Sequence, residues 1–353
     1  MAMESTANPI CVGFIELWHP HLRILASHPS TGWLRFLRPP RPSASASAKK
    51  HSTDTNTVKA FHGNTNTIPI DPDIDFVVVA VVALAHKQAI LLAIPAGKDL
   101  LVEWPGDINL KETMEIAQAA KAKGVKTLVG LQEDSRLSFI KELIDEGKIG
   151  KVLSTSIITM APKQLGYWGP RINERNISTI HKDHGSTLLD IAVGHQLDIV
   201  THILGDFASV SVTTVTIYPT AKIFSATSTE TRPEPVTASD HVAFSSLLKS
   251  GAIASVTWRG GYASTLGHVL LVWVIDSEDG TIRVEEDAVS GTFMRMHDQS
   301  CFSMGSVCQR TRIGDAKYAM LAEAVKLKTL LAEVNDSARD GKRSIWCDLF
   351  IVA

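Results

Sequence analysis

Excess charge and long apolar runs are both scarce in this sequence, and each absence excludes a class of protein. The 353 residues carry 35 Lys and Arg against 37 Asp and Glu, a formal net charge of -2. This balance provides no overall field that would attract nucleic acid or an anionic membrane. The apolar run Phe76–Ala85 is about half the length that a membrane-spanning helix needs. We therefore expect neither nucleic-acid nor membrane partners.

Cysteine is also scarce, and its placement matters more than its number. Cys11, Cys301, Cys308 and Cys347 are scattered and have no metal-ligand spacing, so no metal site is predicted. Sparse, unpaired thiols are typical of a reducing compartment. The N-terminus also lacks the basic-then-apolar pattern of a secretion signal. These features predict a soluble cytoplasmic protein.

The first half of the chain alternates strand and helix patterns. The run Asp73–Val81 is rich in β-branched residues, as in a strand buried on both faces of a parallel sheet. Short apolar strands and helices closed by glycine surround it. The expected elements are strands at 10–15, 100–102 and 127–131 and helices at 87–96, 109–122 and 138–146. This order predicts a Rossmann-like doubly wound parallel sheet in residues 1–150.

One segment of the first half interrupts this pattern. From Leu37 to Asn56 the sequence consists of Pro, Ser, Ala, Lys and Thr, with almost no large apolar residue. Such a segment buries too little surface to offset its ordering entropy. We therefore expect residues 16–56 to be degraded or disordered.

The second half has a different texture after Gly150. Strands rich in Val, Thr, Ser and Ile, several of them alternating, surround one strong helix over 187–204 and precede another over 318–338. The expected strands are 152–158, 208–218, 241–248, 252–259 and 270–275. The pattern predicts an α+β domain with a largely antiparallel open sheet in residues 151–343, followed by a tail over 344–353.

Three motifs in this order resemble a known family. Glu103-Trp104-Pro105, Val129–Gln132 and Gly194–Asp198 are similar to the glucose-fructose oxidoreductase / inositol dehydrogenase / MocA superfamily. Within it, the chain looks most like the fungal branch that contains the galactose-regulon repressor. That branch carries Glu-Trp-Pro where the dehydrogenases carry Glu-Lys-Pro, and it shares the segment Gly147–Ser154. The resemblance implies NAD or NADP as cofactor, a sugar, polyol or similar hydroxylated substrate, and a homodimer.

The cofactor site departs from the family's pattern. A dinucleotide site needs glycines directly after the first strand, so that the pyrophosphate can approach backbone N–H groups. Here Gly13 stands alone and Glu16 follows, so we expect impaired binding. Arg35 and Arg38 lie near the position of the missing ribose-binding acidic residue. The resemblance implies that the cofactor-binding residues are Gly13, Phe14, Ala83, His86, Glu103, Trp104 and Pro105.

Two of these residues have more specific expected roles. His86 opens a helix and is expected to shape the site rather than react. Trp104 occupies the position at which the dehydrogenases carry lysine. Its indole can stack on a nicotinamide or sugar face, but it cannot donate a proton to an alkoxide.

The helix over 187–204 carries the candidate catalytic residues. Hydride transfer from an alcohol requires a base for the hydroxyl proton, and an imidazole with a pKa near 6.5 suits neutral pH. The family's pattern is Asp, three residues, His, two residues, Asp. His195 and Asp198 match its last two positions, which implies an acid/base role for His195, oriented by Asp198. Ile191 stands at the first position. Asp190 lies one residue earlier, a rotation of about 100° on an α-helix, and is expected to face elsewhere.

Three functional readings remain open at this point. The first is an NAD(P)-dependent oxidoreductase acting on CH–OH groups of a small molecule. The second is a non-catalytic regulator of the galactose-repressor type, which would bind a nucleotide and a protein partner, in the nucleus or the cytoplasm. Trp104 and Ile191 favour this second reading. The third is an inactive paralogue, which residues 16–56 favour.

Overall fold

The structure is a computed structural model, and it describes residues 10–16, 31–37, 48–49, 52, 59–61, 67–131, 138–225, 228–263, 269–287, 301–303 and 319–345. The chain divides into two compact units, the first comprising residues 1–130 and 319–325 and the second 131–318 and 326–353. The division lies before the expected boundary near Gly150, because α5 (Ser138–Asp145) packs against α6 (Gly194–Leu204) of the second unit. Within the described ranges, no helix is long and apolar enough to cross a membrane.

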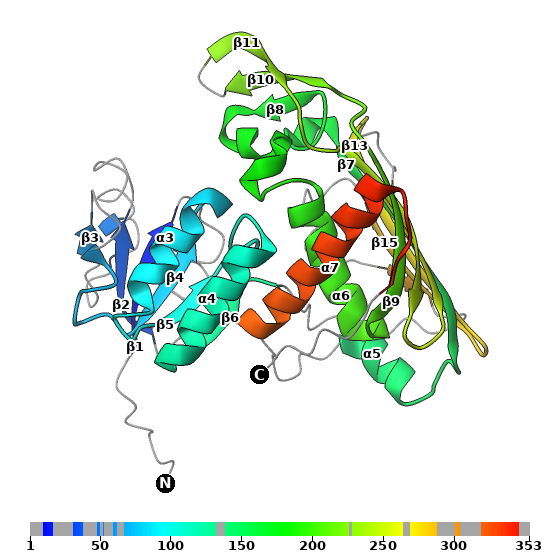
Figure 1. The fold of residues 1–353 in the computed structure, drawn as a ribbon, viewed down its shortest axis with the longest axis horizontal. Helices are drawn as coiled ribbons and strands as arrows, with labels where there is room; N and C mark the ends of the chain where they lie inside the picture. The colour runs from blue at the N-terminus through cyan, green and yellow to red at the C-terminus, as the bar shows by residue number, and fades with distance from the viewer. Residues whose placement is uncertain are drawn as a thin grey trace. The chain divides into compact units, whose positions relative to one another are not determined.

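The described part of the first unit forms a six-stranded sheet in the order β3-β2-β1-β4-β5-β6 (Figure 1). Every neighbouring pair is parallel, and the order reverses between β1 and β4, as in a doubly wound fold. The strands are β1 (Ile10–Glu16), β2 (Thr31–Leu37), β3 (Lys59–Phe61), β4 (Phe76–Ala80), β5 (Asp99–Val102) and β6 (Thr127–Val129). Val77, Val78 and Val79 of β4 are all fully buried. The predicted Rossmann-like sheet is confirmed.

Strand β2 lies inside the segment that was expected to lack regular structure. It pairs in parallel with β1 on one side and with β3 on the other. The expectation is therefore wrong for residues 31–37, where Trp33, Leu34, Phe36 and Leu37 supply the apolar residues that a strand needs. Most of the polar stretch over 38–56 lies outside the described residues.

Local signals account for the helices of the first unit, α3 (Ala83–Ala93) and α4 (Leu110–Lys123). The Asn109 side chain caps α4 by accepting the Glu112 N–H at 3.0 Å. Gly124 ends α4 in the left-handed conformation, with φ at 73°. Helix α3 begins at Ala83, earlier than predicted, and only residues 81 and 82 separate it from β4.

The described part of the second unit forms an eight-stranded sheet in the order β16-β15-β14-β7-β13-β12-β9-β17. Its pairs are antiparallel except for β7 with β13, which confirms the predicted largely antiparallel sheet. The strands are β7 (Val152–Pro162), β9 (Phe207–Val215), β12 (His241–Leu248), β13 (Ile253–Tyr262), β14 (Val269–Ser277), β15 (Thr281–Asp287), β16 (Cys301–Ser303) and β17 (Ser344–Ile345). Helix α6 and the late helix α7 (Leu321–Asp340) lie against one face of this sheet (Figure 1).

Two further features of this unit were not predicted. A three-stranded sheet joins β8 (Arg171–Asn173), β10 (Thr220–Ser225) and β11 (Ser228–Pro235) around a small core of its own. Strand β11 is polar and contains two prolines. Sheets accommodate proline mainly in edge strands, so the sequence of β11 does not resemble a typical strand. In the expected tail, Ser344 and Ile345 form β17 and pair with β9.

Candidate functional site

The carboxyl ends of β4 and β5 form one part of the candidate site. In open parallel sheets, ligands bind outside the carboxyl ends of the strands, at the point where the strand order reverses. Here that point lies between β1 and β4. The chain leaves β4 through Val81 and Val82 and enters α3 at Ala83. The first backbone N–H groups of a helix have no partner four residues earlier within it, and in α3 the Ala85 N–H donates to the Val82 carbonyl at 2.8 Å.

His86 ties the ends of β4 and β5 together. Its ring is 1% exposed, and its Nε2 lies 3.2 Å from the Val81 backbone nitrogen. Its Nδ1 lies 2.9 Å from the Pro105 carbonyl oxygen. Because a backbone N–H only donates, Nε2 accepts, and the Nδ1–H donates to Pro105. The imidazole therefore connects two loops of the sheet edge without facing solvent.

Glu103, Trp104 and Pro105 follow β5 directly. The Glu103 N–H donates to the Val79 carbonyl at 2.9 Å, and its Oε2 accepts the Trp104 N–H at 3.1 Å. The Trp104–Pro105 peptide bond is cis, and Trp104 is buried. These contacts fix the backbone at the carboxyl end of β5.

Gly130 lies against Glu103, a contact that the sequence did not reveal. A Cβ at this position would lie 2.7 Å from Glu103 Oε2 and 3.3 Å from Glu103 Cα. The Gly130 N–H donates to the Val102 carbonyl at 2.7 Å. The Glu103 side chain therefore lies over this glycine, and a larger residue would displace it. Gly130 belongs to the motif Val129–Gln132, but the sequence indicated only the family resemblance of this motif and not the contact with Glu103.

Gly13 and Phe14 lie within β1, which continues to Glu16. Gly13 pairs with Arg35 and Val77, and Phe14 with Phe36 and Val78. A Cβ on Gly13 would lie 2.6 Å from Ile68 Cγ2 and 2.9 Å from Ile74 Cδ1. Packing within the unit accounts for this glycine. The chain after β1, residues 17–30, lies outside the described residues.

In the second unit, the predicted helix begins with a π-turn, η5 (Leu189–Val193), which leads into α6. The Val193 N–H donates to the Leu188 carbonyl at 3.0 Å, and the Gly194 N–H donates to that of Leu189. A turn closed by such bonds takes in one more residue than an α-turn. The rotation of 100° per residue therefore does not apply between Asp190 and His195. The expectation that Asp190 faces elsewhere therefore stays a prediction.

Asp190 is held by both of its carboxylate oxygens. Its Oδ2 accepts the Thr187 N–H at 3.1 Å and the Thr187 hydroxyl at 2.7 Å. The Asp190 N–H donates back to Thr187 Oγ1 at 3.2 Å, which completes a capping box. Its Oδ1 lies 3.8 Å from Lys328 Nζ on α7. Lys328 was not predicted, because no local signal in the sequence pairs it with Asp190.

His195 and Asp198 lie one turn apart on α6 and are each 7% exposed. Gln196, between them, connects the helix to the sheet. Its Nε2 donates to Thr159 Oγ1 of β7 at 3.2 Å, and its Oε1 accepts the indole N–H of Trp258 on β13. The side-chain amide thus fixes the rotation of α6, and with it the directions in which His195 and Asp198 leave the helix.

The aromatic loop before β8 is a packing feature. Trp168 is 2% exposed and adopts a positive φ of 42°. A Cβ on Gly260 would lie 1.8 Å from the Trp168 carbonyl oxygen, so this close approach requires glycine. Burial raises the pKa of Tyr167, opposed by the charge of Arg175 and a hydrogen bond from Asn176.

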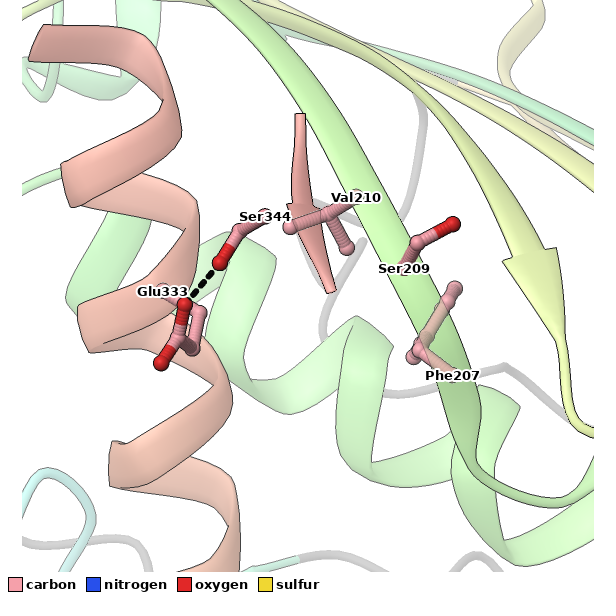
Figure 2. A pocket seen from close by; sticks show the side chains of 5 residues that line it. All are labelled: Phe207, Ser209, Val210, Glu333 and Ser344. Atoms are coloured by element: carbon pink, nitrogen blue, oxygen red, sulfur yellow. Dashed lines mark hydrogen bonds between the residues drawn. The ribbon is translucent and has the colours of Figure 1, made fainter. Parts of the chain in front are cut away.

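A shallow pocket lies apart from the predicted site residues of this unit. Figure 2 shows its lining from β9, α7 and β17. The Ser344 hydroxyl donates to the Glu333 carboxylate across it. The lining residues are Phe207, Ser209, Val210, Glu333 and Ser344. None of them is a predicted catalytic or cofactor residue, and the pocket is too shallow to be the candidate site.

Two family models match the chain, one for each half. Residues 19–131 match the oxidoreductase family with an NAD-binding Rossmann fold. Residues 136–286 match the C-terminal domain of Gal80p. Together they cover most of the chain.

Curated relatives include both enzymes and a regulator. Dehydrogenase aclE of Aspergillus oryzae is 31% identical over 165 residues, which are 46% of this chain and 43% of that protein. The galactose/lactose metabolism regulatory protein GAL80 of Saccharomyces cerevisiae is 26% identical over 226 residues, 61% of this chain and 51% of that protein. The 1,5-anhydro-D-fructose reductase of Ensifer adhaerens is 30% identical over 140 residues, 38% and 39%. The chain spans about half the length of these relatives, or less.

Solved structures share the fold over nearly the whole chain. A super-repressor mutant of Gal80p from Saccharomyces cerevisiae has a TM-score of 0.80 at 19% identity, covering 96% of this chain and 98% of that one. Levoglucosan dehydrogenase in complex with NADH has a TM-score of 0.70 at 16% identity, covering 96% and 99%. At these identities the likeness shows the fold alone. The chain thus combines a first segment that matches the oxidoreductase family model with a second segment that matches the Gal80p C-terminal domain model.

Proposed function

We propose that this protein is an NAD(P)-dependent oxidoreductase that acts on a CH–OH group of a sugar, polyol or similar hydroxylated small molecule. The observation that carries the proposal is the placement of His195 and Asp198, one turn apart and buried on a helix that Gln196 fixes to the sheet. Several relatives are sugar dehydrogenases or reductases by name. A buried imidazole beside a carboxylate is suited to acid/base chemistry on a hydroxyl group.

The first unit fits a dinucleotide in its strand order and in the edge formed by β4, α3 and β5. A bound nicotinamide would supply or accept the hydride. The first turn of α3, which begins at Ala83, and the backbone of Glu103 to Pro105 would hold its end of the cofactor, shaped by His86. The lone Gly13 and the Glu16 that follows it in the sequence lead us to expect weakened binding of the pyrophosphate.

The residue that follows β2 in the sequence supports a preference between the two dinucleotides. This strand ends at Leu37, and Arg38 follows it in the sequence. NAD sites carry an acidic residue there for the ribose hydroxyl, whereas a nearby arginine accommodates a 2′-phosphate. We therefore propose NADP in preference to NAD.

In the proposed reaction, His195 takes the proton of the substrate hydroxyl as the hydride leaves the carbon. The carboxylate of Asp198, one turn later, orients the imidazole and stabilises its protonated form. In the first unit, Trp104 provides an apolar face, and its indole cannot take up or release a hydroxyl proton.

Titration with NADH and NADPH, followed by quenching of tryptophan emission, tests the proposal together with turnover on a panel of sugars and polyols. We expect saturable binding, tighter for NADPH, and a loss of turnover of about 10²–10⁴-fold in His195→Ala with binding retained. His202→Ala, a change on the same helix, serves as the control and keeps activity. An absence of binding to either nucleotide would refute the proposal.

A second function has its own supporting observation. The C-terminal domain model of a regulatory protein matches residues 136–286, and Trp104 stands in place of the lysine of the dehydrogenases. In this reading the protein binds a nucleotide and a protein partner, in the nucleus or the cytoplasm, without turnover. Nucleotide binding by the wild type with no turnover on any substrate of the panel would favour it.

We also propose that the enzyme is a homodimer through the open face of the large sheet. Helices α6 and α7 cover one face. Ile158 and Ile253 are 42% and 57% exposed, and across the β7–β13 pair they are in register with Thr257 and Ser154. Ile158→Asp is expected to convert dimer to monomer in light scattering, whereas Ile70→Asp, on an exposed side chain of the first unit, leaves the mass unchanged.

A further inference from the structure

Lys328 is a buried cation on a helix whose other basic residues are exposed. Its side chain is 3% exposed, against 49% for Lys326 and 67% for Arg339 on the same helix. Lysine is almost never fully buried unless it is paired, because removing its charge from water is costly. Its ion-pair partner is Asp190, at the start of the π-turn that leads to His195.

The two ends of this turn are anchored independently. At its start, Asp190 is held by the capping box with Thr187 and by Lys328 of α7. At its end, Gln196 is held by Thr159 and Trp258 of the sheet. The turn over 189–193, which includes the first of these anchors, takes in one residue more than a regular α-turn. The chain accommodates it by i→i+5 bonds at Val193 and Gly194.

Such a turn persists only when its surroundings hold it. Wide turns of this kind are rare, occur singly within helices and are frequent at functional sites. Uncommon backbone forms are retained where neighbouring contacts over-determine them. If the anchor at Asp190 were released, the segment before His195 could rotate into ordinary α-geometry. That rotation would change what lies beside the imidazole.

We propose that Lys328 is a positioning residue for His195, acting through Asp190 to keep the wide turn in place. The catalytic consequence rests on the proposed function, because it presumes that His195 is the acid/base. The geometric consequence does not. The rival account, a simple ion pair between two helices, predicts a loss of stability with no change at the turn.

The test compares Lys328→Met, Lys328→Arg and the control Lys326→Met in the full chain. The first removes the charge at similar length, the second keeps it, and the third removes an exposed lysine that pairs with Asp206. One measurement is the imidazole ¹H–¹⁵N correlation of His195, assigned by its disappearance in His195→Gln. The other is amide exchange at Val193 and Gly194, whose N–H groups make the i→i+5 bonds.

We expect Lys328→Met to move the His195 signal and to speed exchange at Val193 and Gly194 by on the order of tenfold or more. Lys328→Arg should retain the signal and the protection, and Lys326→Met should match the wild type. If the enzyme turns over, Lys328→Met also displaces the pH profile of kcat/KM. A Lys328→Met protein with the wild-type His195 signal and exchange rates would overturn the inference, as would equal effects from Lys326→Met.

A second variant covers the case in which Lys328→Met does not fold. Asp190→Asn removes the charge that faces Lys328 but keeps an oxygen that can accept the Thr187 N–H. The inference requires the same changes at His195, Val193 and Gly194 in this variant. Their absence would overturn it even without any turnover, so a failed inference and a failed enzyme proposal remain distinguishable.

Discussion

Gln196→Leu is the most informative single change, because it tests how α6 is fixed to the sheet. Leucine has a similar size but cannot hydrogen-bond, so Thr159 loses a donor and Trp258 loses its acceptor in a buried environment. Each hydrogen bond contributes about 1 kcal/mol net, and each buried group left unsatisfied costs about 1–3 kcal/mol. The expected loss of unfolding free energy is therefore about 2–4 kcal/mol.

The sheet itself offers a matched control. Thr155 Oγ1 accepts the indole N–H of Trp273 at 2.7 Å, a buried Thr–Trp contact like that at Gln196 but made without α6. Thr155→Val should lower the free energy of unfolding by a comparable amount in urea. It should leave turnover unchanged, because it does not affect the direction of His195. Gln196→Leu should lower both.

A double mutant tests whether Gln196 and Thr159 act together. Combining Gln196→Leu with Thr159→Val should cost less than the sum of the single changes, with a coupling of about 0.5–3 kcal/mol, because the two residues share one hydrogen bond. Additive effects, or an equal loss of turnover in Thr155→Val, would show that Gln196 does not position the helix.

Three further outcomes follow from the first unit. Gly130→Ala should displace the Glu103 side chain, which lies 2.7 Å from the added Cβ, and cost about 1–3 kcal/mol in urea unfolding; it should also weaken nucleotide binding in the fluorescence titration. His86→Leu removes both hydrogen bonds of the ring and should cost about 2–4 kcal/mol by the same unfolding measurement. The hydrogen bond from Lys87 lowers the pKa of Glu115 below its usual 4.5, so the stability difference between wild type and Glu115→Gln should be present above pH 4.5 and disappear as the pH falls through the lowered value. A difference that grows on acidification would contradict this assignment.

Local signals predicted much of the fold. The β-branched run over 73–81 contains β4, and Asn109 and Gly124 mark the ends of α4. Each of these signals acts within a few residues, through steric fit or a helix cap, and can therefore be recognised from the sequence alone. Strand β2 was not predicted, because the polar composition after Leu37 was taken to hold for all of residues 16–56.

The π-turn was missed for a related reason. A rotation of 100° per residue presumes regular α-geometry, and nothing in residues 187–195 announces a departure from it. The departure comes from contacts made at a distance, between Asp190 and Lys328 and between Gln196 and Trp258. None of these partners is close in the sequence, and each belongs to a different element.

The sequence by itself determined the alternation of strand and helix, the family motifs and the candidate pair His195 and Asp198, since these depend on near neighbours and on residue type. Only the tertiary structure decided that Lys328 is a buried cation rather than a solvated one. It also decided that Gly13 and Gly130 are glycines because neighbouring side chains occupy the space of a Cβ. Burial and close approach are properties of the packed chain, in which residues far apart in the sequence exclude water from one another.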